Sequence, residues 1–199
     1  MDQHDWNDRY RGRELLWTVE PNRFVVSVVG ALDSGSALVL AAGEGRNAVW
    51  LAEQGWKVTA IDWSGVAVEK GTWLAAERDV TVEWHHADLL EWEPGPDVYD
   101  LVAIAYLQIP APGRESVWRK AAASVGPGGR LLLIGHDSRN LEEGYGGPSH
   151  PSVLYTASEA SLVVGESLDI ERAETVVRPV DVEGGVRYAI DNLVMARRG

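Results

Sequence analysis

Residues 36–47, SALVLAAGEGRN, join an apolar run to a glycine turn and then to a helix-like pattern. Glycine at positions 43 and 45 lets the backbone turn sharply and approach a ligand closely, and the free N–H groups that open the next helix offer hydrogen-bond donors. The stretch therefore predicts a strand, a ligand-binding turn and a helix. The spacing Gly43-x-Gly45-x-x-Ala48 does not by itself identify the ligand.

Downstream of this turn, apolar β-branched runs alternate with helical patterns, as in parallel strands joined by right-handed crossover helices. The expected strands are 37–41, 57–62, 81–85, 100–105 and 130–136. The expected helices are 46–54, a second that Ser64 caps and that runs to about residue 78, and 113–125, which Gly126-Pro127 ends. This alternation predicts a doubly wound α/β fold.

The last third of the chain follows a different pattern. Residues 138–153 are rich in glycine and proline and predict a loop at the carboxyl edge of the sheet, on the acceptor side of the site. The run from Thr156 to Glu159 has the form of a capping box that opens a helix to about Gly165. Expected strands 168–177 and 186–196 flank a Gly-Gly turn at 184–185, which predicts an antiparallel hairpin. We therefore expect a Rossmann-like sheet of seven strands, mostly parallel with a C-terminal antiparallel hairpin.

Composition restricts the classes of function. The 199 residues show no break in composition, so one domain over 1–199 is expected. The 18 basic and 30 acidic side chains give a formal net charge of −12, which argues against nucleic acid as a partner. Cysteine is lacking and the adjacent His85 and His86 would point to opposite faces of a strand, so no metal site is expected. The early apolar runs are too short for a bilayer span or a signal peptide, which predicts no membrane partner and a cytoplasmic location.

Two ligands compete for the glycine turn. Asp62 lies nineteen residues beyond Gly43 at the end of the second expected strand, where a carboxylate can accept hydrogen bonds from ribose hydroxyls of NAD or of S-adenosylmethionine. Glu44 between the glycines would repel a pyrophosphate but tolerate a sulfonium. Asp88, after the third expected strand, is a second acid suited to an adenine amino group, and the terminal hairpin leaves no residues for a separate substrate domain. These features favour S-adenosylmethionine.

Four motifs together resemble a class I S-adenosylmethionine-dependent methyltransferase, and specifically the small branch related to tellurite-resistance and thiopurine methyltransferases. They are VLAAGEGRNAVWLAEQGWKVTAIDWS, HADLLEW, DLVAIAYLQIP and GPGGRLLLIGHD, and the resemblance runs from about Tyr10 to Arg197. It implies in-line methyl transfer to a small-molecule acceptor, with S-adenosylhomocysteine as product. Because the sulfonium is a good leaving group, such an enzyme mainly aligns the nucleophile and excludes water. A base matters for an oxygen or amine acceptor and is dispensable for a thiol or a reduced chalcogen.

The resemblance implies two sets of site residues. Those expected to bind the cofactor are Gly43, Glu44 and Gly45 at its methionine end, Arg46 and Asn47 at the helix entrance, Asp62 at the ribose, Trp63, Asp88 and Leu89 at the adenine, Ala105 beneath the cofactor, and Tyr10 and Trp17 on an N-terminal helical cap or lid, residues 1–32. Those expected on the acceptor side are Tyr106, Arg178 facing an anionic acceptor, and His136, which is also the general-base candidate by residue type and by its place after the fifth strand.

The chain departs from the family pattern at two positions. Relatives usually carry an acid where Val39 stands and a glycine where Ala41 stands. Two alternatives therefore remain open, a nicotinamide-dependent oxidoreductase and a protein that binds S-adenosylmethionine without catalysis. The fourth strand is followed by Ala105-Tyr106-Leu107-Gln108 rather than Asn-Pro-Pro-Tyr, which argues against amino methylation of DNA bases. The oligomeric state is not indicated.

Overall fold

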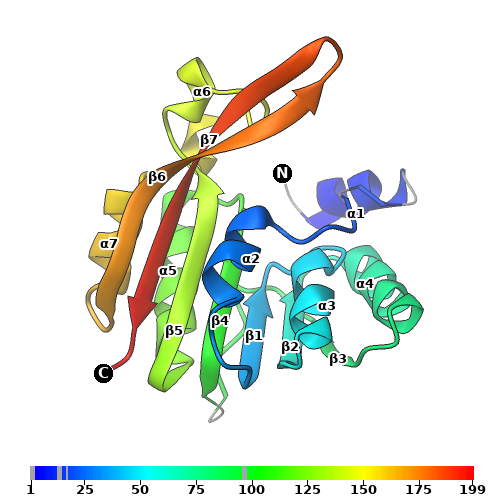
Figure 1. Ribbon diagram of the computed structural model, residues 1–199, viewed down its shortest axis with the longest axis vertical. Coiled ribbons are helices and arrows are strands. Elements are labelled where there is room, and N and C mark those ends of the chain that lie inside the picture. The colour runs from blue at the N-terminus through cyan, green and yellow to red at the C-terminus, as the bar shows by residue number, and fades with distance from the viewer. Residues whose placement is uncertain (1–2, 13–14, 17, 96–97) are drawn as a thin grey trace.

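One sheet of seven strands organises the residues that the computed structural model describes, which are 3–12, 15–16, 18–95 and 98–199 (Figure 1). Its strand order is β3-β2-β1-β4-β5-β7-β6. The elements in chain order are α1 (Gln3–Arg11), α2 (Arg23–Val29), β1 (Ser36–Leu40), α3 (Arg46–Glu53), β2 (Lys57–Asp62), α4 (Gly65–Glu77), β3 (Val82–His86), β4 (Tyr99–Ala105), α5 (Ala111–Ala123), β5 (Val125–His136), α6 (Asn140–Glu143), the 3₁₀ turn η1 (Pro151–Val153), α7 (Ala157–Val164), β6 (Asp169–Val182) and β7 (Gly185–Arg197).

The first five strands run parallel, whereas β7 pairs antiparallel with both β5 and β6. The strand order reverses between β1, which pairs with β2 on one side, and β4, which pairs with β1 on the other. In open α/β sheets, ligands bind outside the carboxyl ends of the strands at such a switch point. The glycine turn follows β1 and Tyr106 follows β4, so both lie at this place.

Helices cover both faces of the sheet, as expected for a doubly wound fold (Figure 1). On one face, α2, α3 and α4 contribute Val25, Val49 and Leu74 to a core over β1, β2 and β4. On the other face, α5 and α7 contribute Trp118 and Val164 to a second core. These apolar faces anchor the strands from both sides, so the loops at the carboxyl edge are free to carry polar side chains.

Local signals predict most element boundaries to within one or two residues. Ser64 caps α4 by accepting a hydrogen bond from the Ala67 N–H at 3.2 Å, and Thr156 and Glu159 form the expected capping box of α7. The expected start of the fifth strand is wrong, because β5 begins at Val125 and contains the Gly-Pro pair that was expected to separate helix from strand. That early start comes from pairing with Tyr99, beyond a register shift in β4, which is a long-range contact.

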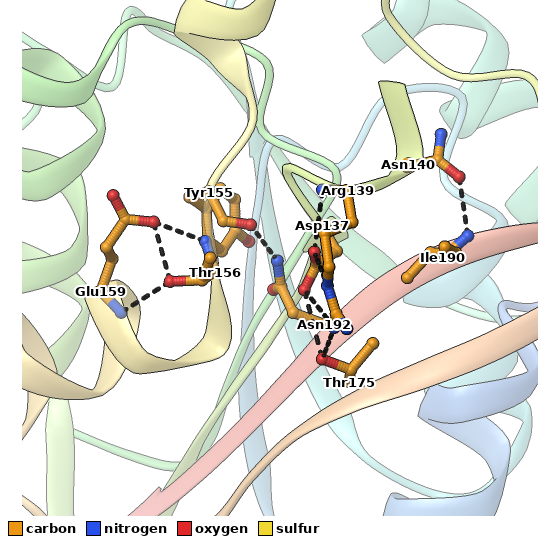
Figure 2. A network of polar contacts seen from close by, with 9 residues as sticks. All are labelled: Asp137, Arg139, Asn140, Tyr155, Thr156, Glu159, Thr175, Ile190 and Asn192. Atoms are coloured by element: carbon orange, nitrogen blue, oxygen red, sulfur yellow. Dashed lines mark hydrogen bonds and ion pairs between the residues drawn. The ribbon is translucent and has the colours of Figure 1, made fainter. Parts of the chain in front are cut away.

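The acceptor-side segment 138–153 is not wholly a loop, since it contains α6 and η1. Buried Asp137 organises its start: its carboxylate accepts from the Arg139 N–H and Nε, both at 3.0 Å, and Arg139 and Asp137 both contact the Thr175 hydroxyl in β6 (Figure 2). Asn140 then accepts from the Ile190 N–H of β7 at 2.7 Å. The segment is therefore fastened to the C-terminal hairpin, which extends beyond the end of β5 (Figure 1).

Among the residues that the structure describes, no helix is both long and apolar enough to cross a membrane.

Candidate functional site

The glycine turn between β1 and α3 has a left-handed backbone at three positions. The φ angles are +53° at Ala41, +57° at Gly43 and +88° at Gly45. Space also requires glycine at position 45, because a Cβ there would lie 2.6 Å from the indole of Trp84. A Cβ at Gly43 would lie 3.1 Å from the hydroxyl of Tyr10. The turn is thus compressed between β3 and the N-terminal helix.

Asp62, at the end of β2, ties the glycine turn to α4. One carboxylate oxygen accepts from the Gly43 N–H at 2.8 Å and the other from the Ser64 N–H at 2.9 Å. Burial raises the pKa of Asp62 above its usual value, and the two backbone hydrogen bonds oppose that shift. Each oxygen keeps acceptor capacity after these bonds, so the carboxylate can also receive hydroxyl groups from a ligand.

Glu44 is directed at the protein rather than into an open site. Its buried carboxylate accepts from the Leu16 N–H at 2.8 and 2.9 Å and pairs with the Lys70 ammonium at 3.1 Å. The charge of Lys70 balances that of Glu44, which weakens the sequence-based argument that Glu44 repels a pyrophosphate. A role for Glu44 at the methionine end of a cofactor stays a prediction.

Helix α1 lies against the glycine turn and the start of α4. Tyr10 is buried and stacks on Trp6, with ring centroids 5.6 Å apart. The two rings belong to a small apolar cluster against which Trp63 packs. The Ser64 hydroxyl donates to Asn7 at 2.6 Å. The role of residues 1–32 as a cap stays a prediction, and Trp17, expected in the same cap, lies outside the described residues.

The residues expected at the adenine belong to separate clusters. Trp63 joins the cluster beneath α1, and its carbonyl faces the His86 Nε2 at 2.8 Å. Leu89 is buried in the core on the α5 face. Asp88 accepts from the Leu90 N–H with one carboxylate oxygen at 2.9 Å, which leaves its other oxygen for a ligand. Binding of adenine by these residues stays a prediction.

A second polar centre lies at the ends of β4, β5 and β7, around Asp191. Three side chains of the described residues contact this fully buried carboxylate: the Tyr106 hydroxyl donates at 2.8 Å, the Arg178 Nε–H donates at 2.7 Å, and the His136 Nδ1 lies at 2.9 Å. The three expected acceptor-side residues therefore meet on one carboxylate. Sequence analysis did not identify Asp191, although a lone acid within the apolar run of β7 was a signal that could have found it.

The charge state of this centre follows from its contacts. Burial alone would raise the pKa of Asp191, but the hydrogen bonds from His136 and Arg178 bring it below its usual value, so the carboxylate is ionised. Burial and the neighbouring Asp191 raise the pKa of Tyr106, so the phenol stays neutral. Burial opposes the charge of Arg178, yet its bond to Asp191 leaves the pKa above the usual value.

Tyr106 has an unusual backbone for an aromatic residue, with φ at +61°. Such strain costs about 1–3 kcal/mol and persists where surrounding contacts impose it. Here the ring centroid lies 4.7 Å from that of His136, and Asn22 donates to the hydroxyl at 3.1 Å. Asn47 accepts from the Asn22 N–H at 2.8 Å and so positions the start of α2 beside this centre, and its expected contact with the cofactor stays a prediction.

Arg46 lies between the glycine turn and the Asp191 centre. The pKa of Arg46 lies below its usual value, chiefly because of burial and also because of the positive charge of Arg178. Tyr106, Tyr10 and Glu44 oppose this shift without reversing it. Within the described part of the chain, no hydrogen bond or ion pair is made by the guanidinium. A half-buried cation of this kind suits the carboxylate of a ligand. Ala105, the last residue of β4, is half-buried and packs against the core under α2 and α3.

Comparisons with known proteins agree with this geometry. Residues 37–129, somewhat under half of the chain, match the family model for a methyltransferase domain. No curated protein matches the sequence significantly.

Solved structures resemble the whole chain at low sequence identity. A protein from a study of the conversion of a disulfide bond into a thioacetal group during echinomycin biosynthesis is 20% identical, with 98% of this chain and 92% of that chain covered and a TM-score of 0.77. The N-methyltransferase NodS from Bradyrhizobium japonicum WM9, in complex with S-adenosyl-L-homocysteine, is 14% identical over 100% and 99% of the chains, with a TM-score of 0.75. TehB from Haemophilus influenzae is 15% identical over 89% of this chain and 62% of its own, with a TM-score of 0.71. The fold is therefore the Rossmann-like methyltransferase fold that the sequence predicts.

Proposed function

We propose that the protein transfers a methyl group from S-adenosylmethionine to a small-molecule acceptor. The observation that carries the proposal is the buried Asp62 carboxylate joined to the glycine turn at the switch point of the sheet, within the segment that matches a methyltransferase domain. A position in the branch of tellurite-resistance and thiopurine methyltransferases is part of the proposal and rests on the four sequence motifs.

The donor set fits the cofactor. The carboxylate of Asp62 can take ribose hydroxyls, the open oxygen of Asp88 can take the adenine amino group, and Arg46 can pair with the methionine carboxylate. Gly43, Gly45 and Ala105 allow close approach of the backbone, and Tyr10 on α1 can cover the bound molecule. The cofactor supplies an electrophilic methyl group on a sulfonium.

The protein's contribution is alignment and the exclusion of water. The C-terminal hairpin carries Arg178, whose guanidinium lies 5.7 Å from the centroid of the Tyr106 ring. Gly147 of the segment 138–153 lies against the ring of His136. We assign the acceptor to this centre, and small size suits it because the strongly negative chain disfavours polyanions such as nucleic acids.

Equilibrium titration tests the choice of cofactor. S-adenosylhomocysteine and NADH are titrated separately into the full chain, and we expect saturable binding of the first and none of the second. Tight binding of NADH without binding of S-adenosylhomocysteine would overturn the proposal in favour of a nicotinamide oxidoreductase.

A non-catalytic binding protein is the second candidate, and Val39 favours it. This side chain is buried in the apolar core of the α2 face, at a position where the resemblance to class I methyltransferases leads us to expect an acid. Transfer of radiolabelled methyl from S-adenosylmethionine across a broad panel of small acceptors separates the two candidates. Binding of the cofactor with no transfer to any acceptor would support the non-catalytic function.

A further inference from the structure

Within the Asp191 centre, the buried carboxylate of Asp191 holds the imidazole of His136. Asp191 lies on β7 and His136 on β5, and the two residues are directly paired in the antiparallel register. The Nδ1 to Oδ1 distance is 2.9 Å. A fully buried charge is costly and is retained where its partners give it a task.

The protonation pattern of the imidazole follows from this contact. An ionised carboxylate only accepts hydrogen bonds, so Nδ1 of His136 must carry the proton that it donates to Asp191. In the neutral ring, Nε2 then carries the lone pair. Within the described residues, nothing donates to or accepts from Nε2 of His136. The ring is thus prepared to accept a proton at that atom.

The surroundings of His136 keep the ring in place. The ring of Tyr106 from β4 lies against it, and Arg178 from β6 shares the carboxylate of Asp191. The backbone between η1 and α6 approaches its edge, since a Cβ at Gly147 would lie 3.1 Å from both Nδ1 and Cε1. In the part of the chain that the structure describes, the titratable and charged groups found at the ring and its carboxylate are Tyr106, Asp191 and Arg178.

We propose that His136 is the general base for the acceptor, that Asp191 is the residue that positions it, and that the acceptor reacts through a neutral N–H or O–H group. This inference rests on the proposed methyl transfer. A thiolate or a reduced chalcogen attacks without losing a proton, so it would leave an oriented base without a task. The acceptor's lone pair forms the new N–C or O–C bond, the S–C bond electrons stay on sulfur as S-adenosylhomocysteine leaves, and the acceptor's proton passes to Nε2 and then to solvent.

The tautomer of His136 provides a test that needs no acceptor. Long-range ¹H–¹⁵N NMR of the full chain with S-adenosylhomocysteine, recorded at the alkaline plateau of the ring's titration, distinguishes a proton on Nδ1 from one on Nε2; His136→Gln assigns the signal. We expect the proton on Nδ1 in the wild type. A proton on Nε2 would overturn the proposal.

Asp191→Asn sharpens that test. Oδ2 of Asp191 accepts from both Arg178 at 2.7 Å and Tyr106 at 2.8 Å, so the amide oxygen of the variant should take this side and turn its NH₂ group toward His136. The imidazole must then accept at Nδ1, and its proton is expected to move to Nε2. The matched control is Asp137→Asn, which alters another buried aspartate whose carboxylate bonds Arg139 and Thr175 rather than the imidazole of His136, and which should leave the tautomer on Nδ1. An unchanged tautomer in folded Asp191→Asn would contradict the positioning role.

Matched acceptors test the substrate class. Methyl transfer to phenol, aniline and thiophenol is measured as a function of pH for the wild type and His136→Gln. We expect transfer to phenol or aniline to fall by about 10²–10⁴-fold in the variant, with affinity for S-adenosylhomocysteine retained. Equal transfer by the two proteins, or transfer to thiophenol alone, would overturn the inference. Failure of the wild type to bind S-adenosylhomocysteine would instead refute the proposed function itself.

Discussion

Replacing Asp62 by alanine removes the carboxylate that we assign to the ribose of the cofactor. Hydrogen bonds to a charged group contribute about 1.5–3 kcal/mol, and we expect a loss of about 1–3 kcal/mol in binding because water replaces part of the interaction. That corresponds to a Kd for S-adenosylhomocysteine that is roughly 5–160-fold higher. The change also strands the buried N–H groups of Gly43 and Ser64, so the free energy of unfolding should fall by about 2–4 kcal/mol.

Isothermal titration calorimetry well below the melting temperature of the variant separates the two effects. The control is Asp100→Ala, because Asp100 likewise accepts from a backbone N–H, that of Ser36 at 2.7 Å, but lies at the amino end of β4 away from the glycine turn. We expect the control to bind S-adenosylhomocysteine like the wild type. Unchanged affinity in Asp62→Ala, or an equal loss in Asp100→Ala, would refute the assignment.

The raised pKa of Asp62 adds a pH dependence to this prediction. Burial raises the pKa above 3.8 in the folded protein, so the folded state binds this proton more tightly than the unfolded state. The part of the stability that depends on this proton is therefore fully present below pH 3.8 and is lost as the pH rises through the raised pKa, whereas the ionised carboxylate still accepts from the Gly43 and Ser64 N–H groups. Binding should show the opposite trend: affinity for S-adenosylhomocysteine falls as the pH is lowered toward the raised pKa, and Asp62→Asn should lack that dependence.

Three further substitutions test other parts of the structure. Ala41→Gly relieves a left-handed residue and should raise the melting temperature by about 1–4 °C in calorimetry, whereas Ala42→Gly next to it should lower it. Gly147→Ala should reduce methyl transfer more than Gly146→Ala does. Both glycines have positive φ, but only a methyl group at position 147 would lie against the imidazole of His136. Equal effects of the two substitutions would contradict that placement. Arg114→Met removes a buried guanidinium bonded to backbone carbonyls and should lower the free energy of unfolding by about 2–4 kcal/mol in urea titration, with a change below 0.5 kcal/mol arguing against a stabilising role.

Local sequence signals predicted the elements that depend on local interactions. Ser64 and Thr156 cap helices because their hydroxyls reach N–H groups three residues on, which sequence spacing reveals. The glycine turn was predictable because few other residues adopt its backbone. The early start of β5 and the short helix α6 were not, since each depends on a partner distant in sequence, Tyr99 for β5 and β7 for the segment around Asn140.

The candidate site divides in the same way. Asp62 ends β2, nineteen residues after Gly43, and this spacing can be recognised from local sequence patterns. In the structure the Gly43 N–H donates to the Asp62 carboxylate at 2.8 Å. Asn47 was located by the same motif, but its partner was not, because Asn22, the N-cap of α2, lies 25 residues earlier in the chain. Glu44 illustrates the limit, since its contacts with the Leu16 N–H and with Lys70 of α4 arise only from tertiary packing.

The sequence by itself determined the order of strands and helices, the glycine turn and the parallel-then-antiparallel character of the sheet, because hydrophobic period, caps and turns act over a few residues. Only the tertiary structure decided that Asp191 meets His136, 55 residues away, and Tyr106, 85 residues away. These contacts depend on β7 inserting next to β5, a lateral order set by long-range packing of apolar faces. For that reason a lone aspartate in an apolar strand became interpretable as the centre of the site only once its neighbours were known.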